Sequence, residues 1–212
     1  MNVTIESLAE YKSWLPGVLC DEQIRWLALN RGMIDPFVDR AIRTNEKGER
    51  ILSYGLGSYG YDFRVADEWN VFAPTGRNVV VDPKKMDEHA FVTVKGEGSV
   101  VIPPNGFVLA RSIERFVIPS DVICIVFTKS SYARAGVTMQ LTPLEPCWKG
   151  YVTVEISNTT PHGARVYADE GVGQILFLKG SAPCEKTYAN KNEGGAAGKY
   201  QDQPSEIVLP RL

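Results

Sequence analysis

The sequence has few of the cysteine and histidine patterns that mark secreted or metal-binding domains. Its four cysteines are scattered without a CxxC pair, and its only histidines are His89 and His162. Closely spaced cysteine pairs are typical of disulfide-stapled domains and structural zinc sites, so neither class is indicated. No apolar run reaches the length of a signal segment or a membrane span. We therefore expect a reduced, cytoplasmic protein with no membrane partner.

Charge of one sign is not in excess either. The chain has 23 Lys and Arg against 25 Asp and Glu, a formal net charge of -2. This excludes a broad basic field for a nucleic-acid polymer, so any anionic ligand must meet local cations. With 212 residues and a hydrophobic share of 44%, the chain is long and apolar enough for one domain with its own core.

Short apolar runs separated by turn residues fill much of the chain. Many short strands with little helix predict a mainly β fold, either a sandwich or a jelly-roll barrel. One helix is expected to be capped by Asp21, after a weakly patterned extension over residues 1–20. The runs expected as strands include Val79–Val81, Phe91–Val94, Val100–Ile102, Phe107–Leu109, Val122–Phe127, Ala164–Tyr167 and Val172–Leu178.

A compact group of cations and hydroxyls follows the run Val122–Phe127. Lys129, Ser130 and Ser131 lead into a short helical segment that contains Arg134 and that Gly136 can end. A helix start exposes unpaired N–H groups and the positive end of a dipole, which favour a phosphate. The alternative is that Ser130 is only an N-cap and that the two cations are solvated.

One acid stands inside a strand-like run. Polar and apolar residues alternate over residues 151–158, which places Glu155 on the polar face together with Thr153. A glutamate on the polar face of a strand is usually only solvated, and that alternative stays open beside a catalytic role.

Several motifs resemble those of a known family. A Ser-Ser/Thr-x-Ala-Arg motif is present at residues 130–134, and a Trp-x-Gly strand that ends in Glu is present at residues 148–155. The segment from Ser130 to Asn158 thereby resembles the dCTP deaminase branch of the trimeric dUTPase superfamily. True dUTPases carry an apolar residue at the position of Glu155, so this residue distinguishes the two branches. Further likenesses are Gly60-Tyr61-Asp62 and Gly171-Val172-Gly173-Gln174-Ile175.

The resemblance implies a fold and an activity. The fold would be a dUTPase-like distorted jelly-roll or β-barrel with a few short helices over residues 21–190, followed by a mobile tail, residues 191–212, that closes over the nucleotide. The protein would be a homotrimer with sites between neighbouring subunits. It would hydrolyse dCTP to dUTP and ammonia in pyrimidine deoxynucleotide metabolism, with dTTP or dUTP as inhibitor or product.

The resemblance also implies roles for individual residues. Glu155 would be the base that takes a proton from water, while Ser130 and Arg134 would hold that water and the developing charge. Zinc deaminases use H-x-E and P-C-x-x-C motifs, and neither occurs here, so no zinc-bound water is expected. Nucleotide contacts are expected from Lys129, Ser131 and Lys199 to a triphosphate screened by Mg²⁺, from the backbone near Thr142 to the amine, and from Tyr188 and Gln203 of the tail.

Glu145 leaves a second activity open. It lies three residues before Trp148, where dUTPases keep the catalytic Asp that activates water for phosphate cleavage, and some superfamily members also hydrolyse the dUTP that they form. A Glu between Pro143 and Pro146 is equally an acid of a rigid turn, the interpretation that we favour. A pure dUTPase and a non-catalytic nucleotide-binding relative are the remaining alternatives.

Four further expectations concern single positions. Asp62 is expected to be structural, accepting backbone N–H bonds, and Arg111, Glu114 and Arg115 are expected to form surface ion pairs of small value. Thr128 stands where relatives usually have Gly, which alters the approach of the backbone to a phosphate. The segment around Gln140 departs from the Asn- or His-containing run expected in a wall of the base pocket.

Overall fold

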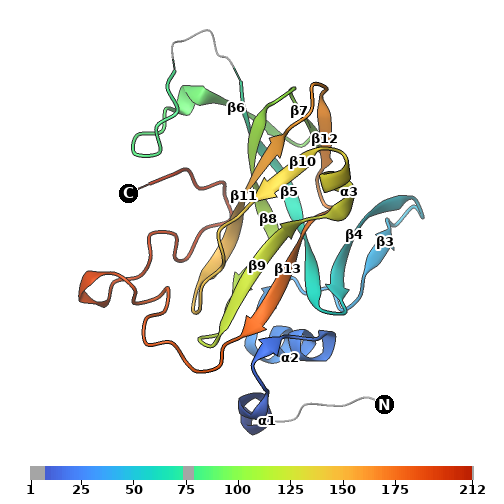
Figure 1. The fold of residues 1–212 in the computed structure, drawn as a ribbon. Coiled ribbons are helices and arrows are strands. Elements are labelled where there is room, and N and C mark those ends of the chain that lie inside the picture. Colours follow the sequence, from blue (N-terminus) through green and yellow to red (C-terminus); the bar gives the residue numbers. More distant parts are fainter. Residues whose placement is uncertain (1–7, 74–78, 212) are drawn as a thin grey trace.

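The chain forms a curled antiparallel sheet with two helices at one end and a short third helix at its side (Figure 1). The structure is a computed structural model that describes residues 8–73 and 79–211. The helices are α1 (Leu8–Ser13), α2 (Asp21–Arg31) and α3 (Ser130–Arg134), and the 3-10 turns are η1 (Glu88–Ala90) and η2 (Glu193–Gly195). The strands are β1 (Gly17–Val18), β2 (Ile34–Asp35), β3 (Ile42–Thr44), β4 (Arg50–Gly57), β5 (Gly60–Phe72), β6 (Phe91–Lys95), β7 (Ser99–Ile102), β8 (Phe107–Val117), β9 (Val122–Thr128), β10 (Val137–Gln140), β11 (Lys149–Asn158), β12 (Ala164–Tyr167) and β13 (Gly171–Lys179).

Strand β5 joins the two halves of the curled sheet. Residues 61–64 of β5 pair with β13, whereas residues 65–71 pair with β8. On one side β13 continues to β9 and β1, and on the other side β8 continues to β11 and then β10. The register shifts within these pairings are bulges, which bend a strand and allow it to change neighbours. Strands β7 and β12 form a separate two-stranded sheet.

The core lies inside the curl. Because neighbouring strand residues point to opposite faces, every second side chain turns inward. Phe63, Trp69, Phe116 and Phe177 are fully buried there. The mainly β fold predicted from the short apolar runs is confirmed, and six of the seven runs named above lie in strands.

The run Val79–Val81 is the exception, and its prediction as a strand is wrong. It pairs with no strand among the described residues, and Val80 is 75% exposed. The carbonyl and side chain of Asp82 instead accept the N–H groups of Lys85 and Lys84, which turns the chain immediately after the run. A local apolar composition favours a strand, but only an available partner strand satisfies its backbone.

Residues 8–20, part of the weakly patterned extension expected over residues 1–20, are joined to the rest of the molecule. Strand β1 pairs with the end of β13. Tyr11 stacks on Trp26 of α2 at 5.6 Å between ring centroids, and its hydroxyl donates to Asp121. Aromatic packing therefore ties this segment to the domain. Residues 1–7 of the extension lie outside the described residues.

The first turn of α2 differs from the prediction by one residue. Its N-cap is Cys20, and Asp21 is the first helical residue rather than the cap. The side chain of Gln23 accepts the N–H of Cys20 at 3.1 Å. Asp21 then stabilises the positive end of the helix dipole by its charge.

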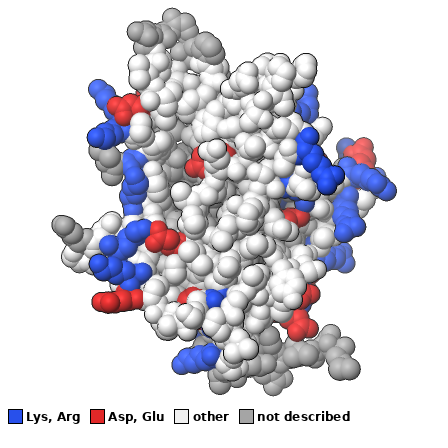
Figure 2. Space-filling view, viewed as in Figure 1, with Lys and Arg blue, Asp and Glu red and all other residues white. Residues whose placement is uncertain are grey.

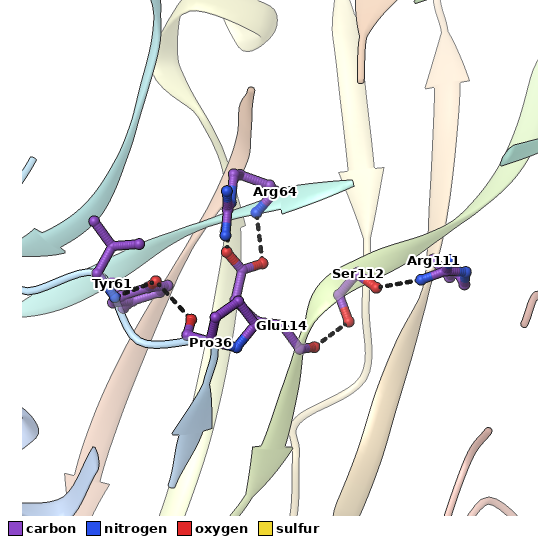
Figure 3. Close-up of polar contacts among 7 residues, drawn as sticks. Pro36, Tyr61, Arg64, Arg111, Ser112 and Glu114 are labelled. Carbon is purple, nitrogen blue, oxygen red and sulfur yellow. Dashed lines mark hydrogen bonds and ion pairs between the residues drawn. The ribbon is translucent and has the colours of Figure 1, made fainter. Parts of the chain in front are cut away.

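Glu114 is not at the surface, so its prediction as a surface ion pair is wrong. Its side chain is 0% exposed and points from β8 toward Arg64 of β5, as Figure 3 shows. The Nε and backbone N–H of Arg64 donate to the two carboxylate oxygens at 2.8 and 2.9 Å. Burial raises the pKa of the Glu114 carboxyl, while Arg64 opposes that rise. The backbone carbonyl of Glu114 accepts the hydroxyl of Ser112 at 2.6 Å, which completes this buried network.

Charges on the outside are of mixed sign. Figure 2 shows Lys and Arg next to Asp and Glu mainly at the margins of one face, with a largely uncharged middle. This face therefore carries no broad basic field. Within the described part of the chain, no helix is long and apolar enough to cross a membrane.

Candidate active site

A cavity of about 1060 Å³ lies beside β11. Side chains of β5, β8 and β11 line it from the sheet, and residues 81–86, 141–145 and 188–210 line it from loops and the tail. Figure 1 shows residues 79–90 and the segment after β13 on the same side of the sheet, next to β11 and β8. Segments far apart in the sequence thus enclose one space.

Glu155 is the acid in this cavity. It lies on β11 between its register partners Leu109 of β8 and Gln140 of β10. Its Oε2 is buried and has no hydrogen-bond partner among the described residues. Burial raises the pKa of Glu155 to about 7. One oxygen of this carboxyl is thus shielded from solvent, and the catalytic role of Glu155 stays a prediction.

An apolar wall explains why Glu155 is desolvated. Phe72, Phe107 and Leu109 line the same cavity, and the rings of Phe72 and Phe107 meet edge-to-face at 5.0 Å between centroids. Such a wall removes water from around the carboxylate, which disfavours its charged form. The result is a half-buried carboxyl that can hold or release a proton near neutral pH.

The segment that follows β13 lines the cavity through Tyr188 and Gln203. The backbone N–H of Tyr188 donates to the carbonyl of Pro146 at 2.8 Å, and its hydroxyl accepts the N–H of Tyr200 at 3.0 Å. The side chain of Gln203 accepts the hydroxyl of Thr153 at 3.1 Å. Both predicted tail contacts therefore lie in the cavity of Glu155.

The turn after β10 supplies Thr142 and Glu145. Both line the cavity. The backbone of this turn is fixed by a bridge between Leu144 and Cys124 of β9. The carboxylate of Glu145 forms an ion pair with Lys191 of the tail, so this acid joins the turn to the tail.

The helix α3 holds three of the other predicted residues. Ser130, Ser131 and Arg134 are exposed on it. The N-cap position is occupied by Lys129, so the alternative that Ser130 is only an N-cap is wrong. Their hydroxyls and guanidinium thus lie at the surface of the chain.

Lys129 is held by an acid of β5. Its ammonium is 2.5 Å from Asp62, which also accepts the side-chain amide of Gln174 at 3.2 Å. Asp62 was expected to accept backbone N–H bonds, and its described partners are instead side chains. The residue is structural in a different way, because it fixes Lys129 beside the start of α3.

One chain brings together only part of the predicted set. Glu155, Thr142, Tyr188, Gln203 and Glu145 line the cavity. Figure 1 shows α3 on the opposite side of the sheet from the tail. Lys199 is exposed on the tail and is not part of the cavity lining. The residues that the single chain does not bring to Glu155 are Lys129, Ser130, Ser131, Arg134 and Lys199.

Sequence reasoning missed Thr153 and Gly150 as parts of the site. Thr153 was placed on the face of Glu155 by the alternation, which was a usable signal. Gly150 has φ +139°, and a Cβ there would lie 2.5 Å from the backbone N of Gln203. That contact depends on a tail more than fifty residues away, so no local pattern could have revealed it.

The described residues offer no metal site of their own. Within residues 8–73 and 79–211, no group of three or more His, Cys, Asp or Glu side chains is placed to hold a metal ion. The chemistry of the cavity is that of one carboxyl with a raised pKa, the ion pair of Glu145 and Lys191, an amide, hydroxyls and an apolar wall. Such a set can exchange protons with a bound molecule and hold a small aromatic ring.

Comparisons with known proteins point to one family. The model of the dCTP deaminase-like family matches residues 18–180. The curated dCTP deaminase of Chloroflexus aggregans is 54% identical over 195 residues, which cover 92% of this chain and 98% of that protein. The dCTP deaminase of Azotobacter vinelandii is 50% identical over 191 residues, 90% of this chain and 97% of that protein.

A solved structure shares the fold. The 2′-deoxycytidine 5′-triphosphate deaminase of Agrobacterium tumefaciens matches with a TM-score of 0.57 and 16% identity, over 79% of this chain and 49% of that chain. The expected mainly β barrel fold is therefore confirmed. The chain belongs to the dCTP deaminase-like family, because the family model matches most of its length and its sequence is about half identical to these relatives.

Proposed function

We propose that the protein is a dCTP deaminase that hydrolyses dCTP to dUTP and ammonia in pyrimidine deoxynucleotide metabolism. Relatives named dCTP deaminase support this activity, one of them 54% identical in sequence over 92% of this chain. The observation that carries it is Glu155, which lines a cavity of about 1060 Å³ and whose buried Oε2 has no partner among the described residues. A buried acceptor without a hydrogen bond is destabilising unless a ligand or water donates one to it.

Glu155 acts as the base. Its carboxylate takes a proton from water as the water oxygen attacks C4 of cytosine, and the proton passes to N3. The proton of the new C4 hydroxyl then passes to the amine, the bond from C4 to the amine nitrogen breaks, and ammonia leaves as the C4 carbonyl of uracil forms. A carboxyl with a pKa of about 7 can both accept and return a proton at neutral pH.

We infer a homotrimer in which α3 of one subunit faces the cavity of its neighbour. The separation of α3 from the Glu155 cavity within one chain supports this arrangement (Figure 1). Ser130 and Arg134 of the neighbour would then hold the attacking water and stabilise the developing charge. Closed symmetry is the usual form of such assemblies.

Lys129, Ser131 and Lys199 hold the triphosphate, and Mg²⁺ enters with the nucleotide as part of the substrate. The ammonium of Lys129 has three donors, and its pairing with Asp62 leaves others for phosphate oxygens. The carbonyls near Thr142 contact the departing amine. Uridine or thymidine triphosphates share the phosphate contacts, so dUTP and dTTP bind as product and inhibitor.

We propose that the reaction needs no zinc. The sequence contains neither H-x-E nor P-C-x-x-C, the motifs by which zinc deaminases bind metal and move protons. The four cysteines are free, which suits a reducing cytoplasm.

A second activity is kept as an alternative because Glu145 lines the same cavity as Glu155. If Glu145 activated water toward a phosphate, dUTP would continue to dUMP. Its ion pair with Lys191 supports the competing interpretation of a turn acid that anchors the tail.

One incubation separates these activities. The protein is incubated with dCTP and Mg²⁺, and dCTP, dUTP, dUMP and ammonia are measured with time. We expect ammonia and dUTP in equal amounts. Sustained dUMP would establish the second activity, consumption of dUTP alone would identify a pure dUTPase, and binding of dCTP without turnover would identify a non-catalytic relative.

A further inference from the structure

One side chain of β11 holds the tail at two points. Thr153 lies two residues before Glu155 on the same strand and is buried. Its hydroxyl donates to Oε1 of Gln203 and accepts the backbone N–H of Val208, both at 3.1 Å. A hydroxyl has one donor and free lone pairs, so it can do both at once.

Gly150 lets the tail come this close. It forms a parallel bridge with Gln203, and the N–H of Tyr151 donates to the carbonyl of Gln203 at 3.1 Å. A Cβ at Gly150 would lie within 3.0 Å of the N, O and Cα atoms of Gln203, and φ there is +139°. Only a glycine accommodates both the conformation and the approach. The backbone of Gln203 is thereby placed beside Thr153.

The sheet, and not the tail, sets the position of Thr153. The pairing of β11 with β8 shifts register between Tyr151 and Thr153. The N–H of Val152 at this bulge donates to the hydroxyl of Ser112 at 2.8 Å. Because bulges re-aim neighbouring side chains, Thr153 is directed by contacts made between β11 and β8, in which the tail takes no part.

Thr153 also orients the amide of Gln203. The N–H of Val208 occupies a lone pair of the hydroxyl, so the hydroxyl hydrogen is available to Gln203, which turns Oε1 toward it. The Nε2 group is then the part of the amide left to donate to a ligand. Gln203 and Glu155 line one cavity, and cytosine presents acceptors at O2 and N3.

We propose that Thr153 is a positioning residue that fixes the closed tail and the Gln203 amide relative to Glu155, and so holds the base of the nucleotide beside the carboxylate. This inference rests on the proposed function, because it takes dCTP as the ligand. Thr153 itself touches neither water nor base in the reaction. Its effect passes through Gln203 and the tail.

The test uses the full-length chain with Thr153→Val, which keeps the shape and removes the hydroxyl. Thr153→Ser restores the hydroxyl, and Thr44→Val on exposed β3 is the matched control. Trypsin cleavage after Lys199 reports opening of the tail, and ammonia release from dCTP with Mg²⁺ gives kcat and KM. We expect Thr153→Val to be cleaved roughly 10-fold faster and to have a KM raised by a similar factor, because two hydrogen bonds are lost. Thr153→Ser and Thr44→Val should behave as wild type.

Val208→Pro tests the same contact from the tail. It removes the N–H donor and leaves β11 unchanged, so it should also speed cleavage after Lys199. Wild-type cleavage in both Thr153→Val and Val208→Pro, or no rescue by Ser, overturns the proposal. If the wild type leaves dCTP unchanged while Thr153→Val still opens the tail, the tail contact stands and the proposed function alone fails.

Discussion

A buried carboxylate oxygen without a hydrogen-bond partner is destabilising, so Glu155 calls for a physical reason. Its Oε2 is buried and finds no partner in the described part of the chain, and the residue shares its cavity with Phe72, Phe107 and Leu109. Replacement by an apolar residue would relieve this cost. The presence of an acid here is explained if water and a nucleotide base supply the missing hydrogen-bond partners of its carboxylate during the reaction.

Glu155→Gln should change stability in a pH-dependent way. Because burial raises the pKa of Glu155 to about 7 in the folded protein, the folded state keeps this proton to higher pH than the unfolded chain. The stability that the protonated carboxyl contributes is full below the unfolded pKa and is lost as the pH rises through about 7. The neutral Gln has no such loss. Urea unfolding should therefore show the variant equal to wild type at low pH and more stable at high pH, by about 1 to 3 kcal/mol.

Glu97→Gln, in the exposed turn between β6 and β7, is the control for this measurement. A stability difference between wild type and Glu155→Gln that does not vary with pH would show that the carboxyl titrates normally.

Arg64→Leu should be strongly destabilising, because it leaves Glu114 buried without its partner. The expected loss is about 3 to 5 kcal/mol in the free energy of unfolding. Double replacement of Arg64 and Glu114 by apolar residues should recover much of that loss, since no uncompensated charge remains. Thermal or urea unfolding of the single and double variants measures this. A double variant as unstable as Arg64→Leu would contradict the assignment.

At the scale of elements, the strands were predictable and their partners were not. The apolar runs that became β7, β9 and β12 were recognisable from their composition and the turn residues around them, and alternation over residues 151–158 placed Glu155 on the same face as Thr153. Alternation along β8 also indicates the burial of Glu114, because Ser112 and Glu114 lie on the same face as the buried Phe116. The apolar composition of Val79–Val81 wrongly predicted a strand, because strand formation depends on pairing with a distant strand.

In the candidate site, too, individual residues were predictable from the sequence and their long-range contacts were not. Motif resemblance selected Glu155, Tyr188 and Gln203, which meet in one cavity. The cavity itself depends on long-range contacts, such as the approach of Gln203 to Gly150, that no local sequence pattern encodes. The mobility of the tail also stays a prediction, since its contacts with β11 describe only the closed form.

The tail should respond to nucleotide. The run 194–198 has little side chain to bury, and ordering it costs roughly 1 to 2 kcal/mol per residue. We expect elastase to cut within 194–198 in the free protein and MgdCTP to protect this run, because phosphate and base add contacts to the closed tail. Deletion of residues 194–212 should leave a folded barrel with severely reduced turnover. Cleavage that is indifferent to nucleotide, or unchanged kinetics after deletion, would identify a passive extension.

At the scale of the whole molecule, shared sites predict complementation between two inactive variants. Glu155→Gln lacks the base, and Arg134→Ala lacks the group proposed to come from the neighbour. After the two variants are mixed and their subunits are exchanged at random, about a quarter of the sites should combine an intact Glu155 with an intact Arg134. Ammonia release should return to a similar fraction of wild type. Sedimentation should show a trimer, and an active monomer or a mixture without activity would contradict shared sites.

The most direct test compares ammonia release from dCTP with Mg²⁺ by wild type and Glu155→Gln, with dCTP binding measured on the same preparations. Gln keeps the shape of the side chain and removes the base. If Glu155 activates the water, turnover should fall by on the order of 10² to 10⁴ while dCTP still binds. Near-normal ammonia release by Glu155→Gln would contradict the central role of this carboxylate.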